Sequence, residues 1–159
     1  MTSVVRQVEA AFETALNVAL FGAAKVTGFR AYVEHGLVKS SDGDGRPEVL
    51  VAVTPAASEN YASPVISFDV ALTVRLEWSD DPTIRAFDET AAVVERMIMR
   101  WNCRANIEEM SAALTTDNFR CDGFRLGGGS DNISGDGSRS SISTVFNMTV
   151  KGVFIDDET

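Results

Sequence analysis

Few residues in this chain have types and spacing that could support catalysis or metal binding. His35 is the only histidine, so neither a Ser-His-Asp triad nor a Cys-His dyad can form without it. A metal site needs a cluster of ligands, and His35, Cys103 and Cys121 lack ligand spacing. We therefore interpret His35 as a structural residue and both cysteines as free thiols, and we expect neither metal nor cofactor.

Two segments rich in glycine and aspartate match ligand-binding loops only in part. The stretch SDGDG begins like a calcium loop, but Arg46 stands where a third oxygen ligand belongs and Pro47 where the turn glycine belongs. The stretch GGGSDNISGDGS lies between two predicted strands, whereas a phosphate-binding loop leads into a helix. Both segments are predicted to be long polar loops, at 39–46 and 127–138.

The adjacent carboxylates Asp80 and Asp81 also have a structural interpretation. Pro82 follows them, and proline is favoured at the first helical position. A capping role for one of the two aspartates is therefore preferred to general acid-base catalysis. The sequence offers no other combination of nucleophile, base and metal ligands, so the chain is predicted not to be an enzyme.

The clearest structural signal is the alternation in ISFDVALTVRLEW, residues 66–78, which predicts a long strand with one apolar and one polar face. The next segment predicts a helix, whose apolar stripe from Ile84 to Trp101 is expected to pack on that strand. Ser3 is the expected N-cap of the first helix. Helices are predicted at 3–24, 79–101 and 105–116, and strands at 29–38, 47–55, 66–78, 118–126 and 139–155.

This order of elements predicts an α+β fold. We expect one largely antiparallel sheet of four to five strands, with a mixed sheet as the alternative, packed against two main helices and ending in a long C-terminal hairpin. Residues 1–159 are expected to form a single domain with a short acidic tail at 156–159.

The charge balance limits the classes of partner. The net charge of −9 argues against sequence-independent binding to DNA or RNA, which needs surplus lysine and arginine. The same charge suits a surface that DNA passes without sticking, and it equally suits simple solubility. No apolar run reaches about 18 residues and no signal pattern is seen, so we expect synthesis in a cytoplasm and no membrane partner.

The layout resembles the tail terminator (tail completion, neck) proteins of tailed bacteriophages. The strand, turn and helix of residues 66–101 carry most of the resemblance, together with the F-x-M-x-V-x-G pattern of the last strand, STVFNMTVKGVF. The resemblance implies a protomer that assembles into a ring, usually a hexamer. Such a ring caps the tail tube, stops its polymerisation and joins the tail to the head-tail connector, while DNA passes through without sequence-specific binding.

The resemblance also implies partners and a location. The partners would be further copies of the chain, the tail-tube protein and head-tail connector proteins, in the tail or neck of a virion assembled in a bacterial host cytoplasm. One alternative is another neck or tail component, namely a head-completion protein or a tail-tube subunit. A less favoured alternative is a small enzyme or ligand-binding domain with a pocket built from Tyr32, His35, Asp69 and Arg75.

Two surfaces are candidates for contacts. The polar face of residues 66–78 carries Asp69, Arg75 and Glu77, which we expect to contact a neighbouring subunit or line the lumen. The predicted loop at 127–138 is the candidate for contact with a neighbouring ring. Its proposed contact residues are Gly128, Asp131, Asn132, Asp136 and Arg139.

Overall fold

The computed structural model describes residues 3–22, 30–33, 47–56, 64–78, 84–135 and 140–156. Only the backbone is described at 20–22, 30–33, 77–78, 84–86, 128–135 and 140. The helices are α1 (Val4–Gly22), α2 (Ile84–Trp101) and α3 (Ile107–Leu114), and a 3-10 helix (Arg104–Asn106) precedes α3. The strands are β1 (Arg30–Val33), β2 (Glu48–Pro55), β3 (Val65–Trp78), β4 (Phe119–Gly135) and β5 (Ser140–Phe154).

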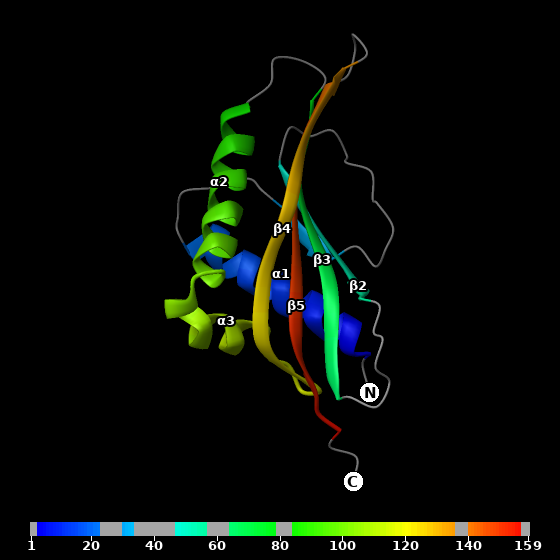
Figure 1. Cartoon of the computed structure of the whole chain (residues 1–159). Coiled ribbons are helices and arrows are strands. Elements are labelled where there is room, and N and C mark those ends of the chain that lie inside the picture. The colour runs from blue at the N-terminus through cyan, green and yellow to red at the C-terminus, as the bar shows by residue number, and fades with distance from the viewer. Residues whose placement is uncertain are drawn as a thin grey trace.

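The strands form one sheet in the order β1-β2-β3-β5-β4. The β1–β2 pair is parallel and the other three pairs are antiparallel, so the sheet is mixed but largely antiparallel. Figure 1 shows the helices together on one side of this sheet. The predicted α+β class with a C-terminal hairpin is therefore confirmed, with α3 as a third helix beside the two main ones.

The alternating apolar residues of β3 pack in the core, as predicted from the sequence. Phe68, Val70, Leu72, Val74 and Leu76 are all buried, and they belong to one core cluster with the stripe of α2. A slip of one residue would turn this apolar set to the outer face, so the core specifies the register of β3. The α2 residues buried in the cluster are Phe87, Val94, Ile98 and Trp101.

Helix α1 supplies the second main part of the helix layer. Val8, Phe12 and Leu16 lie four residues apart, which places them on one helix face, and all are 0% exposed. The Phe12 ring meets Trp101 of α2 edge-on, with centroids 5.9 Å apart. Trp101 meets Phe124 of β4 at the same separation, so Trp101 joins both main helices to the sheet.

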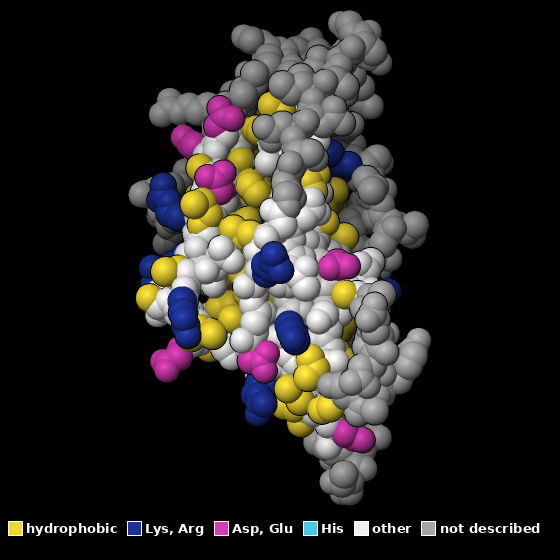
Figure 2. Space-filling view, in the orientation of Figure 1, with side chains coloured by type: hydrophobic (Ala, Val, Ile, Leu, Met, Phe, Trp, Pro, Cys, Tyr) yellow, Lys and Arg dark blue, Asp and Glu magenta, His cyan; other side chains and the backbone are white. Residues whose placement is uncertain are grey.

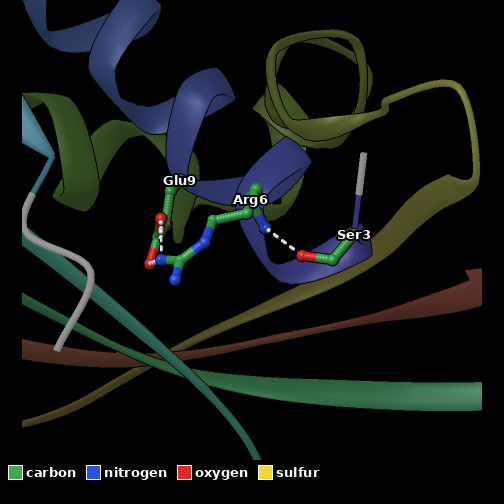
Figure 3. Close-up of polar contacts among 3 residues, drawn as sticks. All are labelled: Ser3, Arg6 and Glu9. Atoms are coloured by element: carbon green, nitrogen blue, oxygen red, sulfur yellow. Dashed lines mark hydrogen bonds and ion pairs between the residues drawn. The ribbon is translucent and has the colours of Figure 1, made fainter. Parts of the chain in front are cut away.

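The start of α1 is capped as predicted. The Ser3 hydroxyl oxygen accepts a hydrogen bond from the backbone N–H of Arg6 at 3.3 Å, which satisfies one of the free donors at a helix start (Figure 3). The Arg6 guanidinium in turn donates to Glu9 at 3.0 Å. Glu9 is 1% exposed, so this bond gives a buried carboxylate a charged partner.

The hairpin of β4 and β5 corrects one prediction. Residues 127–135 were expected to lie in a loop, but they continue β4 and pair with β5, including Ile133 opposite Ile142. The glycines that indicated a loop are accommodated by a register shift between Leu126 and Gly129. A long partner strand therefore outweighs the low strand propensity of this stretch.

A polar cluster fixes the end of β5 against the helix layer. Gln7 of α1 donates to the Asn118 side chain at 2.9 Å and accepts from the Asn118 backbone N–H at 3.1 Å. Asn118 then donates to the Ile155 carbonyl at 2.9 Å, and its own carbonyl accepts from the Ile155 N–H. Three segments far apart in the sequence are therefore held together by one buried amide.

Several predicted features lie outside the described residues. These are the loop at 39–46, His35, the capping segment at 80–82 and the last three residues of the acidic tail. Asp156, the first residue of that tail, is described and exposed.

Candidate assembly interface

The sheet face opposite the helices is here called the open face. Every second residue of each strand points to it. In β3 the residues on the open face are Ser67, Asp69, Ala71, Thr73 and Arg75. The register places the open-face residues of β5 beside them. The open-face residues of β5 include Asn147, Thr149 and Lys151. The alternation of the sequence therefore separates a core face from a polar face, as expected for a sheet covered on one side.

Asp69 lies at the centre of a polar row on the open face. The register places Thr54 of β2 on one side of Asp69, and Thr149 of β5 and then Arg125 of β4 on the other. The Thr149 hydroxyl donates to the Asp69 carboxylate at 3.3 Å, and the Thr54 hydroxyl lies 3.5 Å from the Asp69 carbonyl oxygen. Asp69 remains exposed and available for a further contact.

A shallow groove follows this row. Its volume is about 340 Å³, and Thr54, Asp69, Ala71, Asn147 and Thr149 contribute to its lining. Ala52 and Ala71 are small and lie side by side, next to the polar row, and this gives the otherwise regular sheet a place where a protruding side chain can bind. Such a concavity suits contact with another protein surface.

Arg75 has an internal partner. Its guanidinium donates to Glu48 of β2 at 2.9 Å, and only 15% of the Arg75 side chain and 3% of the Glu48 side chain are exposed. The pair joins β2 to β3 across their register. A role for Arg75 in a subunit contact stays a prediction, as it does for Glu77, whose side chain is not described.

The proposed contact residues at 127–138 are placed only in part. Gly128, Asp131 and Asn132 belong to β4, where Asp131 pairs with Thr144 and Asn132 with Ser143. Asp136 and Arg139 lie outside the described residues.

Sequence reasoning missed a basic row on the open face, formed by Arg120, Arg125 and Lys151. The three are exposed, and the β4–β5 register brings them to the same face. Figure 2 shows Lys and Arg side chains over the strip where β4 and β5 run in Figure 1, with acidic side chains nearby. The register shift at Cys121/Gly123 made this row hard to predict, because it changes the parity of β4.

The open face is therefore not acidic, although the chain carries −9. Arg75 and the basic row supply four positive charges among the described open-face side chains, against Glu48 and Asp69. Asp122, in the bulge beside the row, adds a third carboxylate and is exposed. The described side chains of this face therefore carry no surplus of the negative charge that was expected to repel DNA.

The scattered pocket considered for an enzyme is not assembled by the described residues. Asp69 and Arg75 are six positions apart on one strand, which corresponds to about 20 Å. His35 is not described, and only the backbone of Tyr32 is. Among the residues described, no group of three His, Cys, Asp or Glu side chains is placed to hold a metal, and no helix is long and apolar enough to cross a membrane.

Comparison with known proteins gives a likeness in structure and none in sequence. No protein-family model matches the chain, and no curated protein matches it significantly. A solved chain described as "Virion of native gene transfer agent (GTA) particle" is similar, with a TM-score of 0.49 and 13% sequence identity. The match covers 96% of this chain and 100% of that chain.

Proposed function

We propose that this chain is a structural virion protein, a tail terminator whose copies form a closed ring. In this role the ring caps the tail tube, stops its polymerisation and joins the tail to the head-tail connector, in the tail or neck of the particle. The observation that carries the proposal is the sheet, which is covered by helices on one face and presents a polar, grooved face on the other.

The sequence resemblance supports this proposal through its elements. The strand and helix that carry it are present as β3 and α2, joined in one core. The F-x-M-x-V-x-G pattern lies in β5, at the centre of the long ladder between β3 and β4. The segments that suggested the family are therefore the ones that organise the fold.

The open face is suited to protein contact more than to nucleic-acid binding. It presents fixed charges of both signs around a groove, which favours complementary docking with a defined partner. Three exposed cations are few for a tight grip on a phosphate backbone, where about six to ten contacts are typical of strong binders. We assign Asp69 and the basic row to contacts with a neighbouring subunit or the lumen wall.

Native mass measurement and negative-stain imaging test the proposal. We expect closed rings of one size, which bind to the ends of tail tubes and stop their elongation. A monomer at every concentration, with no binding to tube ends, would contradict it. Open tubes that grow with concentration would instead identify a tail-tube subunit, since a terminator closes on itself.

A matched pair of variants tests the assignment of the open face. Asp69→Lys reverses the exposed charge at the centre of the polar row, whereas Asp117→Lys makes the same change in an exposed turn outside the sheet. We expect the first to reduce ring formation or tube-end binding by about tenfold, and the second to leave both unchanged. Equal behaviour of the two variants would remove Asp69 from the interface.

A further inference from the structure

The outer side of the helix layer contains an apolar groove of about 700 Å³, here called the helix groove. Its described lining comes from α1, α2, α3 and the residue that follows α3, and none of it belongs to a described strand. Alanines set its shape, because they leave space between helices that longer side chains would fill. Its apolar lining includes Ala11, Ala15, Val18, Val93, Met97 and Ala113.

Two arginines of α2 border the helix groove. Arg96 and Arg100 are four residues apart on one helix face, and both contribute to the lining. Arg100 is paired with Glu109 at 2.8 Å, whose pKa is held below its usual range by the hydrogen bonds from Arg100. Arg96 makes no ion pair within the described part of the chain, so the groove carries surplus positive charge in a protein of net −9.

A second apolar surface lies at one end of the sheet, and we call it the sheet-end patch. It consists of Phe154 and Ile155, which are both 38% exposed. Val65 pairs with Val153, which places the start of β3 beside the end of β5. The exposed Asp156 follows directly, so an acidic side chain lies beside this apolar surface.

The sheet-end patch cannot turn into the helix groove of its own copy. The Phe154 N–H donates to the Pro64 carbonyl at 3.0 Å, and Asn118 holds both the N–H and the carbonyl of Ile155 at 2.9 Å. These bonds fix the backbone at the end of the sheet, and Figure 1 shows β5 running beyond the helix layer there. Contact between the two surfaces therefore requires a second copy.

We propose that the sheet-end patch of one copy docks in the helix groove of the next copy. Phe154 and Ile155 would bury their apolar surface against the alanine-lined walls, and Asp156 would lie near Arg96 and Arg100. The two surfaces differ, so the contact is head-to-tail, and a head-to-tail contact forms a ring when the rotation from one copy to the next closes on itself. This inference rests on the homo-oligomer part of the proposed function.

Two exposed positions allow the contact to be disrupted without touching the core. Val18→Asp places a carboxylate in the helix groove at a residue that is 68% exposed, and Ile155→Asp places one in the sheet-end patch. Each is expected to weaken self-association by about tenfold or more in sedimentation equilibrium. Met99→Asp is the matched control, because Met99 is 57% exposed on α2 but does not line the groove. Thermal unfolding checks that all three variants fold.

Mixing the variants gives the decisive result. Val18→Asp keeps an intact sheet-end patch and Ile155→Asp keeps an intact helix groove, so an equal mixture retains one good contact per pair. We expect heterodimers in native mass spectra of the mixture, no closed rings, and monomers in each variant alone. Rings that persist in both single variants would overturn this contact while leaving the ring itself standing. A monomeric wild-type chain would overturn both proposals.

A charge exchange tests the electrostatic part separately. Arg96→Glu should weaken association several-fold, and Asp156→Arg in the same chain should restore part of the loss, because each contact in the ring then pairs the exchanged charges. Glu95→Arg, one position away on α2 and outside the groove lining, serves as the control. Strictly additive effects of the two groove and patch substitutions would exclude a direct ion pair between them.

Discussion

At the scale of single residues, Gly152 is a position where the fold leaves no room for a side chain. It lies opposite Cys121 in the β4–β5 ladder, and a Cβ built there would meet the Arg120 carbonyl oxygen and approach the Phe119 ring at 2.7 Å. The Phe119 ring is itself packed edge-on against Phe68 at 5.4 Å, so it has little room to move. The final glycine of the F-x-M-x-V-x-G pattern is therefore explained by a close approach of two strands.

Gly152→Ala is predicted to destabilise the chain by about 3 kcal/mol, as expected for overpacking at a site that cannot relax. Gly123→Ala is the control on the neighbouring strand, because the nearest atom to its new Cβ would be the Lys151 Cβ at 3.5 Å, an ordinary contact. Urea unfolding of both variants measures the difference. Similar stabilities would show that Phe119 and β4 yield to the extra methyl group.

Cys121 makes stability depend on pH in the alkaline range. The thiol is 0% exposed, its sulfur lies 3.5 Å from Met110 Sδ, and burial raises its pKa to about 11 from an ordinary value of 9.0. A raised folded-state pKa means that the stabilising contribution is present below pH 9 and is lost as the pH rises toward 11. The loss is at most about 2 to 3 kcal/mol.

Cys121→Ala is predicted to be less stable at neutral pH but to lose less stability between pH 9 and 11 than the wild-type chain. The measurement is the free energy of unfolding by urea at several pH values. A thiol reagent gives an independent check at pH 8, because exposed Cys103 should react in the folded chain and Cys121 only after unfolding. Equal rates at the two positions would contradict the burial of Cys121.

At the scale of elements, the pair of Arg75 and Glu48 joins β2 to the centre of the sheet. Burying two charges is costly, and removing one partner leaves the other in a place with little water. We predict that Glu48→Ala costs about 3 kcal/mol, and that a double-mutant cycle with Arg75→Ala shows a large coupling energy. Thr54→Ala, an exposed change on the same strand, is the control, with an expected cost below about 0.5 kcal/mol. Additive losses for Glu48 and Arg75 would contradict the pairing.

The elements predicted best from the sequence are those with a sustained period. The alternation of β3 and the stripe of α2 each extend over many residues, so burial of one face determines both type and orientation. The stretch at 127–135 was predicted wrongly because its strand character comes from pairing with β5, which local composition does not reveal. The elements that position the candidate site were therefore predictable, but the length of the hairpin was not.

The candidate site was less predictable than the fold for a similar reason. Asp69 was identified from the alternation of apolar and polar residues along β3 alone, and the structure places it at the centre of a polar row. The basic row depends on the β4–β5 register and on a bulge, and Asn118 depends on partners more than 30 positions away. Contacts between distant segments carry no local sequence signal, so these residues became visible only in the folded chain.

At the scale of the whole molecule, charge opposes the assembly proposed for it. Each copy carries −9, so bringing several copies into a ring accumulates like charge at short range. The proposed contact offers only a few exposed ion pairs in return, each worth about 0.2 to 1 kcal/mol. Repulsion over the whole surface should therefore outweigh attraction at the groove, and the apolar part of the contact must supply the net affinity.

Raising the ionic strength is accordingly predicted to strengthen the ring. Between about 20 and 300 mM salt the Debye length falls from roughly 20 Å to under 10 Å, which screens the repulsion between copies while leaving apolar burial intact. Sedimentation velocity across this range should show the midpoint concentration for assembly falling several-fold. Arg96→Glu makes the net charge of each copy more negative by two, so assembly of this variant should depend more steeply on salt. Dissociation of the wild-type ring by added salt would mean that ion pairs dominate the contact, and it would contradict the apolar docking of Phe154 and Ile155.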